Sequence, residues 1–143
     1  MSSQNNARGF TLIEIMVVLV ILGLLVAVVA PNILGRSDQA KVTIARTQLK
    51  ELSNALDLYK LDNNTYPSGE QGLEALVTKP GGYPEPRNWN PDGYLKSLPT
   101  DPWGNAYQYF APGAQKPYDL FSFGADGREG GEGDATDLSI WDQ

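Results

Sequence analysis

The chain has 143 residues, a net charge of −6, and neither cysteine nor histidine. This length supports one modest domain. The negative charge argues against a nucleic-acid-binding protein, because no basic patch is available to neutralise phosphates. Without cysteine and histidine the chain also lacks disulfides, thiol chemistry, the commonest general base and the usual zinc ligands. An enzyme is therefore disfavoured.

The N-terminus combines a short polar leader with a long apolar segment. Residues 1–9 are polar and contain one basic residue, Arg8, whereas residues 10–30 are apolar except for Thr11 and Glu14. A helix over residues 10–30 is about 31 Å long, which is close to the thickness of the hydrocarbon core of a bilayer. The pattern therefore predicts a membrane-spanning helix.

Helical periodicity continues beyond the apolar segment. Ala27 and Ala30 could mark a signal-peptide cleavage site, but the apolar region of a signal peptide is shorter. Pro31 removes one backbone hydrogen bond and is expected to kink the helix, and Gly35 adds a second weak point. Apolar residues at spacings of three and four then predict an amphipathic helix over residues 38–61, with an apolar stripe that needs a covering sheet or helix.

The rest of the chain predicts short elements and ordered loops. The long helix is expected to end at Asn63 and Asn64, and a short helix capped by Ser68 or Gly69 is expected over residues 70–77. A loop with aromatic anchors should follow over residues 83–104. Two strands are predicted over residues 106–111 and 118–123, and a last strand or apolar plug over residues 138–141. The predicted fold class is α+β, with a long N-terminal helix packed on a small antiparallel sheet.

Glu14 needs a partner, because a carboxylate inside an apolar membrane helix is unfavourable when it is unpaired. The nearest candidate cation is a free amino group at Phe10, which exists only if the chain is cut between Gly9 and Phe10. Glu14 follows four residues later and lies over the first turn of a helix. The amine and the carboxylate could then neutralise each other within one chain or between neighbouring chains.

The segment Arg8-Gly9-Phe10-Thr11-Leu12-Ile13-Glu14 resembles the cleavage signal of type IV pilins and pseudopilins. This resemblance implies that a prepilin peptidase cuts after Gly9 and that Phe10 becomes N-methylated. It also implies that Glu14 serves filament assembly by pairing with the amine of a neighbouring subunit.

Three further segments, residues 66–76, 94–105 and 124–141, resemble the major pseudopilins of type II secretion systems. The resemblance implies a type IV pilin-like fold in three parts: a leader over residues 1–9, a transmembrane and assembly segment over residues 10–30, and a periplasmic globular domain over residues 31–143. The missing cysteines favour a pseudopilin, because type IVa pilins usually close their C-terminal region with a disulfide.

The function implied by this resemblance is that of the major subunit of a periplasmic pseudopilus, which helps to drive folded exoproteins across the outer membrane. The implied location is the bacterial inner membrane, with the globular domain in the periplasm. The implied partners are other copies of the chain, minor pseudopilins, an inner-membrane assembly platform and the prepilin peptidase that also methylates the subunit. The alternatives are a type IV pilin of a surface fibre for adhesion or motility and a membrane-anchored periplasmic enzyme.

An acidic, glycine-rich loop precedes the C-terminus. Its hard oxygen ligands suit calcium rather than zinc or copper, although the spacing is not that of an EF-hand. By itself this pattern is also typical of a solvated surface loop. The resemblance implies one bound calcium ion, with side-chain ligands from Asp126 and Asp134, a further candidate in Asp137, and backbone oxygens from Phe123 and Arg128.

Two other residue sets could suggest a ligand or catalytic site. Trp89, Trp103 and Trp141 could form a ligand platform, but such residues are more often core or loop anchors. Asp101 and Asp119 could be paired acids for glycoside hydrolysis, but no cleft or cofactor motif accompanies them. Both sets are therefore predicted to be structural.

Overall fold

The computed structural model describes residues 9–142, and it describes only the backbone of residues 30–34 and 134. The chain forms two compact units, Met1–Ser37 and Asp38–Gln143. The helix α1 (Leu12–Asn63) contributes to both units. Its helical backbone continues through Pro31, the position of the predicted kink.

In the second unit, α1 is amphipathic, as the periodicity predicts. The buried side chains of its apolar stripe follow one another at spacings of three and four, which places them on one face; they are Ala45, Leu49, Leu52, Leu56 and Tyr59. The helix ends at Asn63, and Asn64 follows in the left-handed conformation with φ of 65°. The predicted helix and its asparagine stop signal are confirmed.

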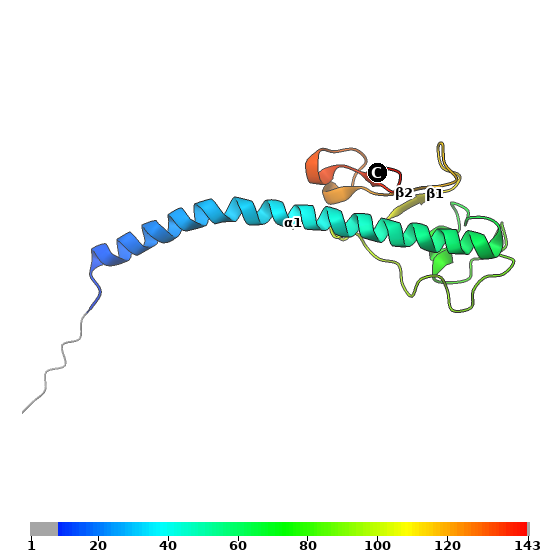
Figure 1. Cartoon of the computed structure of the whole chain (residues 1–143), viewed down its shortest axis with the longest axis horizontal. Helices are drawn as coiled ribbons and strands as arrows, with labels where there is room; N and C mark the ends of the chain where they lie inside the picture. Colours follow the sequence, from blue (N-terminus) through cyan, green and yellow to red (C-terminus); the bar gives the residue numbers. More distant parts are fainter. Residues whose placement is uncertain (1–8, 143) are drawn as a thin grey trace, which may run out of the picture. The chain divides into compact units, whose positions relative to one another are not determined.

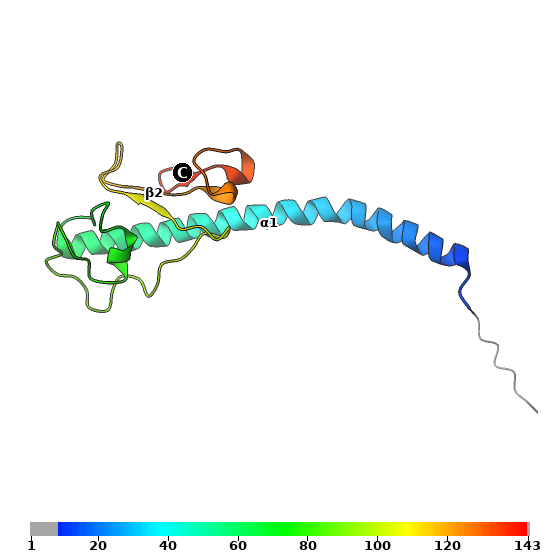
Figure 2. The same ribbon diagram turned by 180° about the vertical axis from the view of Figure 1, so that it is seen from behind.

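A three-stranded antiparallel sheet covers this stripe. Its strands are β1 (Gln108–Phe110), β2 (Asp119–Ser122) and β3 (Leu138–Ser139), in the order β1-β2-β3. The β1–β2 hairpin and the C-terminal loop lie on the same side of α1 in two opposite views (Figures 1 and 2). Both hairpin strands are shorter than predicted, and the last apolar segment is a strand.

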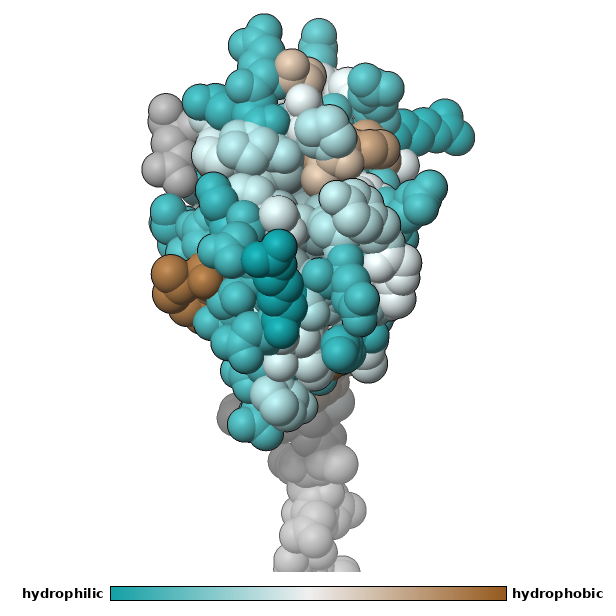
Figure 3. Space-filling view, turned by 90° about the vertical axis from the view of Figure 1, so that its right-hand side faces the viewer, coloured by the Kyte–Doolittle hydropathy of each residue, from teal (hydrophilic) through white to brown (hydrophobic). Residues whose placement is uncertain are grey.

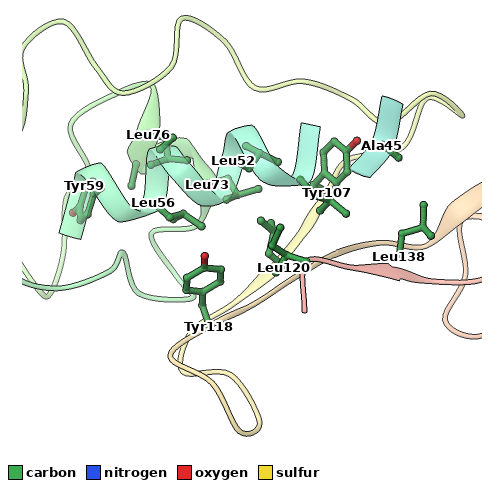
Figure 4. Packing of buried hydrophobic residues seen from close by; sticks show 14 residues of the cluster. Ala45, Leu52, Leu56, Tyr59, Leu73, Leu76, Tyr107, Tyr118, Leu120 and Leu138 are labelled. Carbon is green, nitrogen blue, oxygen red and sulfur yellow. The ribbon is translucent and has the colours of Figure 1, made fainter. Parts of the chain in front are cut away.

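The core forms where α1, the sheet and a short helical segment meet. Leu52 and Leu56 from α1 pack in one buried cluster with Leu76, Tyr118 and Leu120 (Figure 4). Because these residues come from three distant parts of the chain, the cluster fixes the sheet and the loops on the helix.

The short helix predicted over residues 70–77 is only partly present. The structure has a 3₁₀ helix, η1 (Leu73–Leu76), whose preceding residue Gly72 has φ of 61°. A residue with a positive φ cannot continue a right-handed helix, so no helix extends back to residue 70. Ser68 caps the preceding turn instead, since its Oγ accepts the backbone N–H of Gln71 at 3.2 Å.

The long loop over residues 83–104 is held by partly buried polar contacts. Trp89 Nε1 donates a hydrogen bond to the Ala75 carbonyl at 2.9 Å. The buried side chain of Asn63 accepts the backbone N–H of Asn88 at 3.0 Å and donates to the Tyr94 hydroxyl at 3.0 Å. These contacts confirm the prediction of an ordered, anchored loop, except that Tyr83, predicted as its first aromatic anchor, is 89% exposed. The face of the second unit seen in Figure 3 is mostly hydrophilic, with isolated hydrophobic residues.

Candidate functional site

The predicted cleavage site lies directly before the first turn of α1. Gly9 and Phe10 are exposed and lie outside any helix or strand. Thr11 acts as the N-cap of α1, because its Oγ1 accepts the backbone N–H of Glu14 at 3.3 Å. The Gly9–Phe10 peptide bond therefore lies in accessible, non-helical backbone. Arg8 of the predicted signal lies outside the described residues.

Glu14 occupies the third position of α1. The positive end of the helix dipole favours a negative charge at this position. This compensation within the chain was missed by the sequence reasoning, although the spacing of Thr11 and Glu14 is that of a capping box and could have indicated it. The pairing of Glu14 with the amine of a neighbouring chain is an intersubunit contact and stays a prediction.

The first unit exposes a continuous apolar surface. The segment Leu12–Val29 is long and apolar enough to cross a membrane, and none of it is buried. Exposed apolar surface of this extent is unfavourable in water. The segment therefore suits a lipid environment or a bundle of neighbouring helices.

The acidic loop between β2 and β3 folds into two short 3₁₀ helices that contact each other, η2 (Gly124–Asp126) and η3 (Gly133–Ala135). Phe123 directly precedes η2, and Asp126 is its last residue. Asp134 lies within η3, and its side chain is outside the described part of the chain. Both ends of the predicted ligand set therefore belong to one locally folded loop.

Asp137 carries the observation that best fits a bound cation. Its Oδ2 accepts the backbone N–H of Gly130 at 2.9 Å, whereas its Oδ1 is buried and has no hydrogen-bond partner among the described residues. A buried carboxylate oxygen without a donor is unfavourable, and a hard cation can satisfy it. Asp126, by contrast, is exposed, and its Oδ1 accepts the backbone N–H of Arg128 at 3.1 Å.

Among the side chains that the structure describes, which do not include that of Asp134, no three acidic residues form a group that could hold a metal ion. The oxygen chemistry and the unpaired Asp137 oxygen nevertheless fit calcium. The ligand set predicted from the resemblance, Asp126, Asp134, Asp137, Phe123 and Arg128, stays a prediction.

A buried carboxylate lies beneath the start of this loop. The Oδ1 of Asp101 accepts the backbone N–H groups of Trp103 and Asn105 at 3.1 and 2.8 Å. Its Oδ2 accepts the Ser122 hydroxyl at 2.6 Å. Because the buried Asp101 accepts hydrogen bonds from three protein donors, it is a structural acid.

Asp119 has a separate structural role in the β1–β2 turn. Its Oδ2 accepts the backbone N–H of Ala114 at 2.8 Å. Gly113 is required in this turn, since a Cβ there would lie 2.7 Å from the Tyr118 carbonyl carbon. Asp101 and Asp119 therefore have distinct structural partners, as the structural interpretation of these acids predicts.

The tryptophans are anchors, as predicted. Trp89 and Trp103 are partly buried against the core. Trp141 Nε1 donates to the Tyr118 carbonyl at 3.0 Å, which ties the C-terminus to β2. These contacts give each indole a structural partner.

Two family profiles together match almost the whole chain. The profile described as "Type II secretion system (T2SS), protein G" matches residues 32–141. The profile described as "Prokaryotic N-terminal methylation motif" matches residues 4–30. The second match includes Gly9, Phe10 and Glu14.

Similar proteins agree with these matches over nearly their full length. Type II secretion system core protein G of Pseudomonas aeruginosa is 63% identical over 139 residues, which cover 97% of this chain and 98% of that protein. Core protein G of Vibrio cholerae is 55% identical over 141 residues, which cover 99% of this chain and 96% of that protein.

A solved structure supports the same assignment. The crystal structure of the major pseudopilin from the type 2 secretion system of enterohaemorrhagic Escherichia coli matches with a TM-score of 0.68 and 47% identity, covering 78% of this chain and 95% of that one. These relatives are named as core protein G and as the major pseudopilin of a secretion system, a structural family rather than a family of enzymes. The chain therefore belongs to the protein G family of type II secretion systems and is a major pseudopilin.

Proposed function

We propose that the chain is made as a precursor with a removable leader over residues 1–9, a membrane and assembly segment over residues 10–30, and a periplasmic domain over residues 31–143. The methylation motif over residues 4–30 and the apolar helix over Leu12–Val29 support this division. The accessible backbone at Gly9 supports cleavage by a prepilin peptidase at that point.

After cleavage, the new amine at Phe10 is methylated and pairs with Glu14 of a neighbouring subunit. The subunits wait in the inner membrane and then join a periplasmic filament through their apolar helices. Burial of these helices against one another supplies most of the attraction, and the charged pair sets the register between subunits.

The filament consists of many copies of this chain together with minor pseudopilins, and it grows from an inner-membrane assembly platform. Its growth helps to move folded exoproteins across the outer membrane. The observation that carries this proposal is the combined match to the protein G family and to the methylation motif.

A complementation experiment tests the role of Glu14. In a strain that lacks its own protein G, the unchanged chain should restore secretion and Glu14→Gln should not, because the amide has the same size but no charge. Glu51→Gln, which changes an exposed acid on the second unit, is the matched control and should restore secretion. Equal secretion with Glu14→Gln and the unchanged chain would contradict the proposed pairing.

The C-terminal loop is also proposed to bind one calcium ion. Asp126, Asp134 and Asp137 would supply side-chain oxygens, and Phe123 and Arg128 would supply backbone oxygens. The buried, unpaired Oδ1 of Asp137 is the observation that supports this site. A bound cation would remove the repulsion between the clustered carboxylates and close the loop without a disulfide.

A further inference from the structure

Among the described side chains of the second unit, Asp101 is the one acidic residue that is buried, with 3% of its surface exposed. Three donors satisfy its oxygens: the backbone N–H groups of Trp103 and Asn105 and the hydroxyl of Ser122. A buried carboxylate that accepts this many hydrogen bonds fixes the direction of each donor. Asp101 therefore organises the groups around it.

The first connection from Asp101 leads through Ser122 to the start of the acidic loop. Ser122 is 0% exposed and donates its proton to Asp101 Oδ2 at 2.6 Å. Because the carboxylate can only accept, a lone pair of Ser122 Oγ remains to accept the backbone N–H of Gly124 at 3.1 Å. The hydrogen-bond chain thus reaches the first residue of η2.

The second connection runs through Asn105. Its backbone N–H donates to Asp101 Oδ1 at 2.8 Å, and its Nδ2 donates to the Gly124 carbonyl at 3.5 Å. The same amide lies against Gly127, where a Cβ would come within 3.2 Å of Nδ2. Gly127 follows η2 in the left-handed conformation, with φ of 64°. Both ends of η2 are therefore in contact with residues that Asp101 holds.

The turn held in this way contains the residues proposed to provide one half of the calcium site. Phe123 lies between Ser122 and Gly124, and Asp126 is the last residue of η2. Ordering these backbone atoms in advance lowers the entropy that must be lost when a cation binds. Residues that orient metal ligands from outside typically change metal affinity by about 10- to 100-fold when they are replaced.

We infer that Asp101 is a positioning residue for cation binding by the C-terminal loop, acting through Ser122 and Asn105 on the backbone of residues 123–127. This role rests on the proposed calcium site. Asp101 itself does not touch the cation. It holds the loop in the conformation that binds calcium, and it does so in the calcium-free chain as well.

The test compares the full-length chain in detergent with Asp101→Asn and Ser122→Ala. Calcium affinity is measured by isothermal titration calorimetry, and amide hydrogen exchange over residues 123–128 is measured without calcium. Both variants should bind calcium about 10- to 100-fold more weakly and exchange these amides faster. Ser122→Ala removes only the hydrogen bonds of the Ser122 hydroxyl to Asp101 and Gly124. It therefore tests the same role if Asp101→Asn fails to fold.

Asn63→Ala is the matched control, because its hydrogen-bond partners Tyr59, Tyr94 and Asn88 lie outside the acidic loop. It should lower the melting temperature and leave calcium affinity unchanged. If the unchanged chain binds calcium and Asp101→Asn and Ser122→Ala bind it equally well, the positioning role is wrong while the calcium site stands. If the unchanged chain binds no calcium, the calcium site itself is wrong and the positioning role fails with it.

Discussion

Two partly buried tyrosines, Tyr66 and Tyr109, link the stability of the folded chain to pH through the ionisation of their hydroxyls. Tyr109 donates to the Pro67 carbonyl at 2.8 Å, and burial raises its pKa well above the ordinary value. Tyr66 donates to an Asp57 carboxylate oxygen at 2.9 Å. Its pKa is raised to about 12, mainly by burial and to a smaller extent by this hydrogen bond. Both hydroxyls are therefore protonated in the folded chain at pH values where an unfolded tyrosine has begun to ionise.

The sign of this pH dependence follows from linkage. The stabilisation from a raised tyrosine pKa is fully present below about pH 10, the unfolded value, and it is lost as the pH rises through the folded value. We expect the melting temperature of the second unit, followed by near-ultraviolet circular dichroism, to fall steeply between about pH 10 and about pH 12.

Tyr66→Phe should be slightly less stable than the unchanged chain at neutral pH, because one hydrogen bond is lost, but its stability should fall less on alkaline titration. Tyr83→Phe changes an exposed side chain and is the control. An alkaline decline that is identical in Tyr66→Phe and the unchanged chain would rule out a contribution from Tyr66.

At the scale of elements, α1 uses its two faces differently within the second unit. Leu52 is 1% exposed and belongs to the core, whereas Leu58 on the same helix is 55% exposed. Leu52→Ala should lower the free energy of unfolding by about 2–5 kcal/mol, because it leaves a cavity and removes buried apolar surface. Leu58→Ala is the control and should change it by less than about 0.5 kcal/mol. Comparable losses for the two variants, measured by urea unfolding, would contradict this packing.

The C-terminal loop depends on glycine for its fold, and by our proposal it also depends on calcium. Gly131 has φ of 97°, and a Cβ there would lie 2.2 Å from the Ala135 carbonyl oxygen. Excess chelator should lower the melting temperature of the full-length chain by several degrees, because ligand binding to the folded state alone stabilises it. Asp137→Asn should reduce this response, and Glu129→Gln, which changes an exposed acid, should preserve it. A melting temperature that is unaffected by chelator would exclude calcium closure of the loop.

Elements defined by a local repeat could be predicted from the sequence. The three- and four-residue spacing revealed the helix over residues 38–61, and alternation with aromatic residues revealed the two hairpin strands. The ends of the strands and the bounds of η1 were predicted less accurately, because they depend on turn geometry such as the positive φ of Gly72. The Asp101–Ser122 contact joins residues 21 positions apart and has no local signal. The cap formed by Thr11 does have a local sequence signal, since Glu14 follows it at the three-residue spacing of a capping box.

At the scale of the whole molecule, the two units need different environments to be stable. The first unit is an apolar helix with exposed side chains, and the second has its own buried core. A chain of this kind is stable in a membrane or in a filament whose subunits cover the apolar segment. By our proposal, cleavage after Gly9 connects the membrane and filament states, since it would provide the amine that neutralises Glu14 during assembly.

The mass of the intact mature chain, purified from cells with an active type II secretion system, tests this account most directly. We expect a chain that begins at Phe10 and carries one methyl group on its amine. A chain that still contains the leader, or one that begins after Ala30, would contradict the proposed processing and the pairing of Glu14.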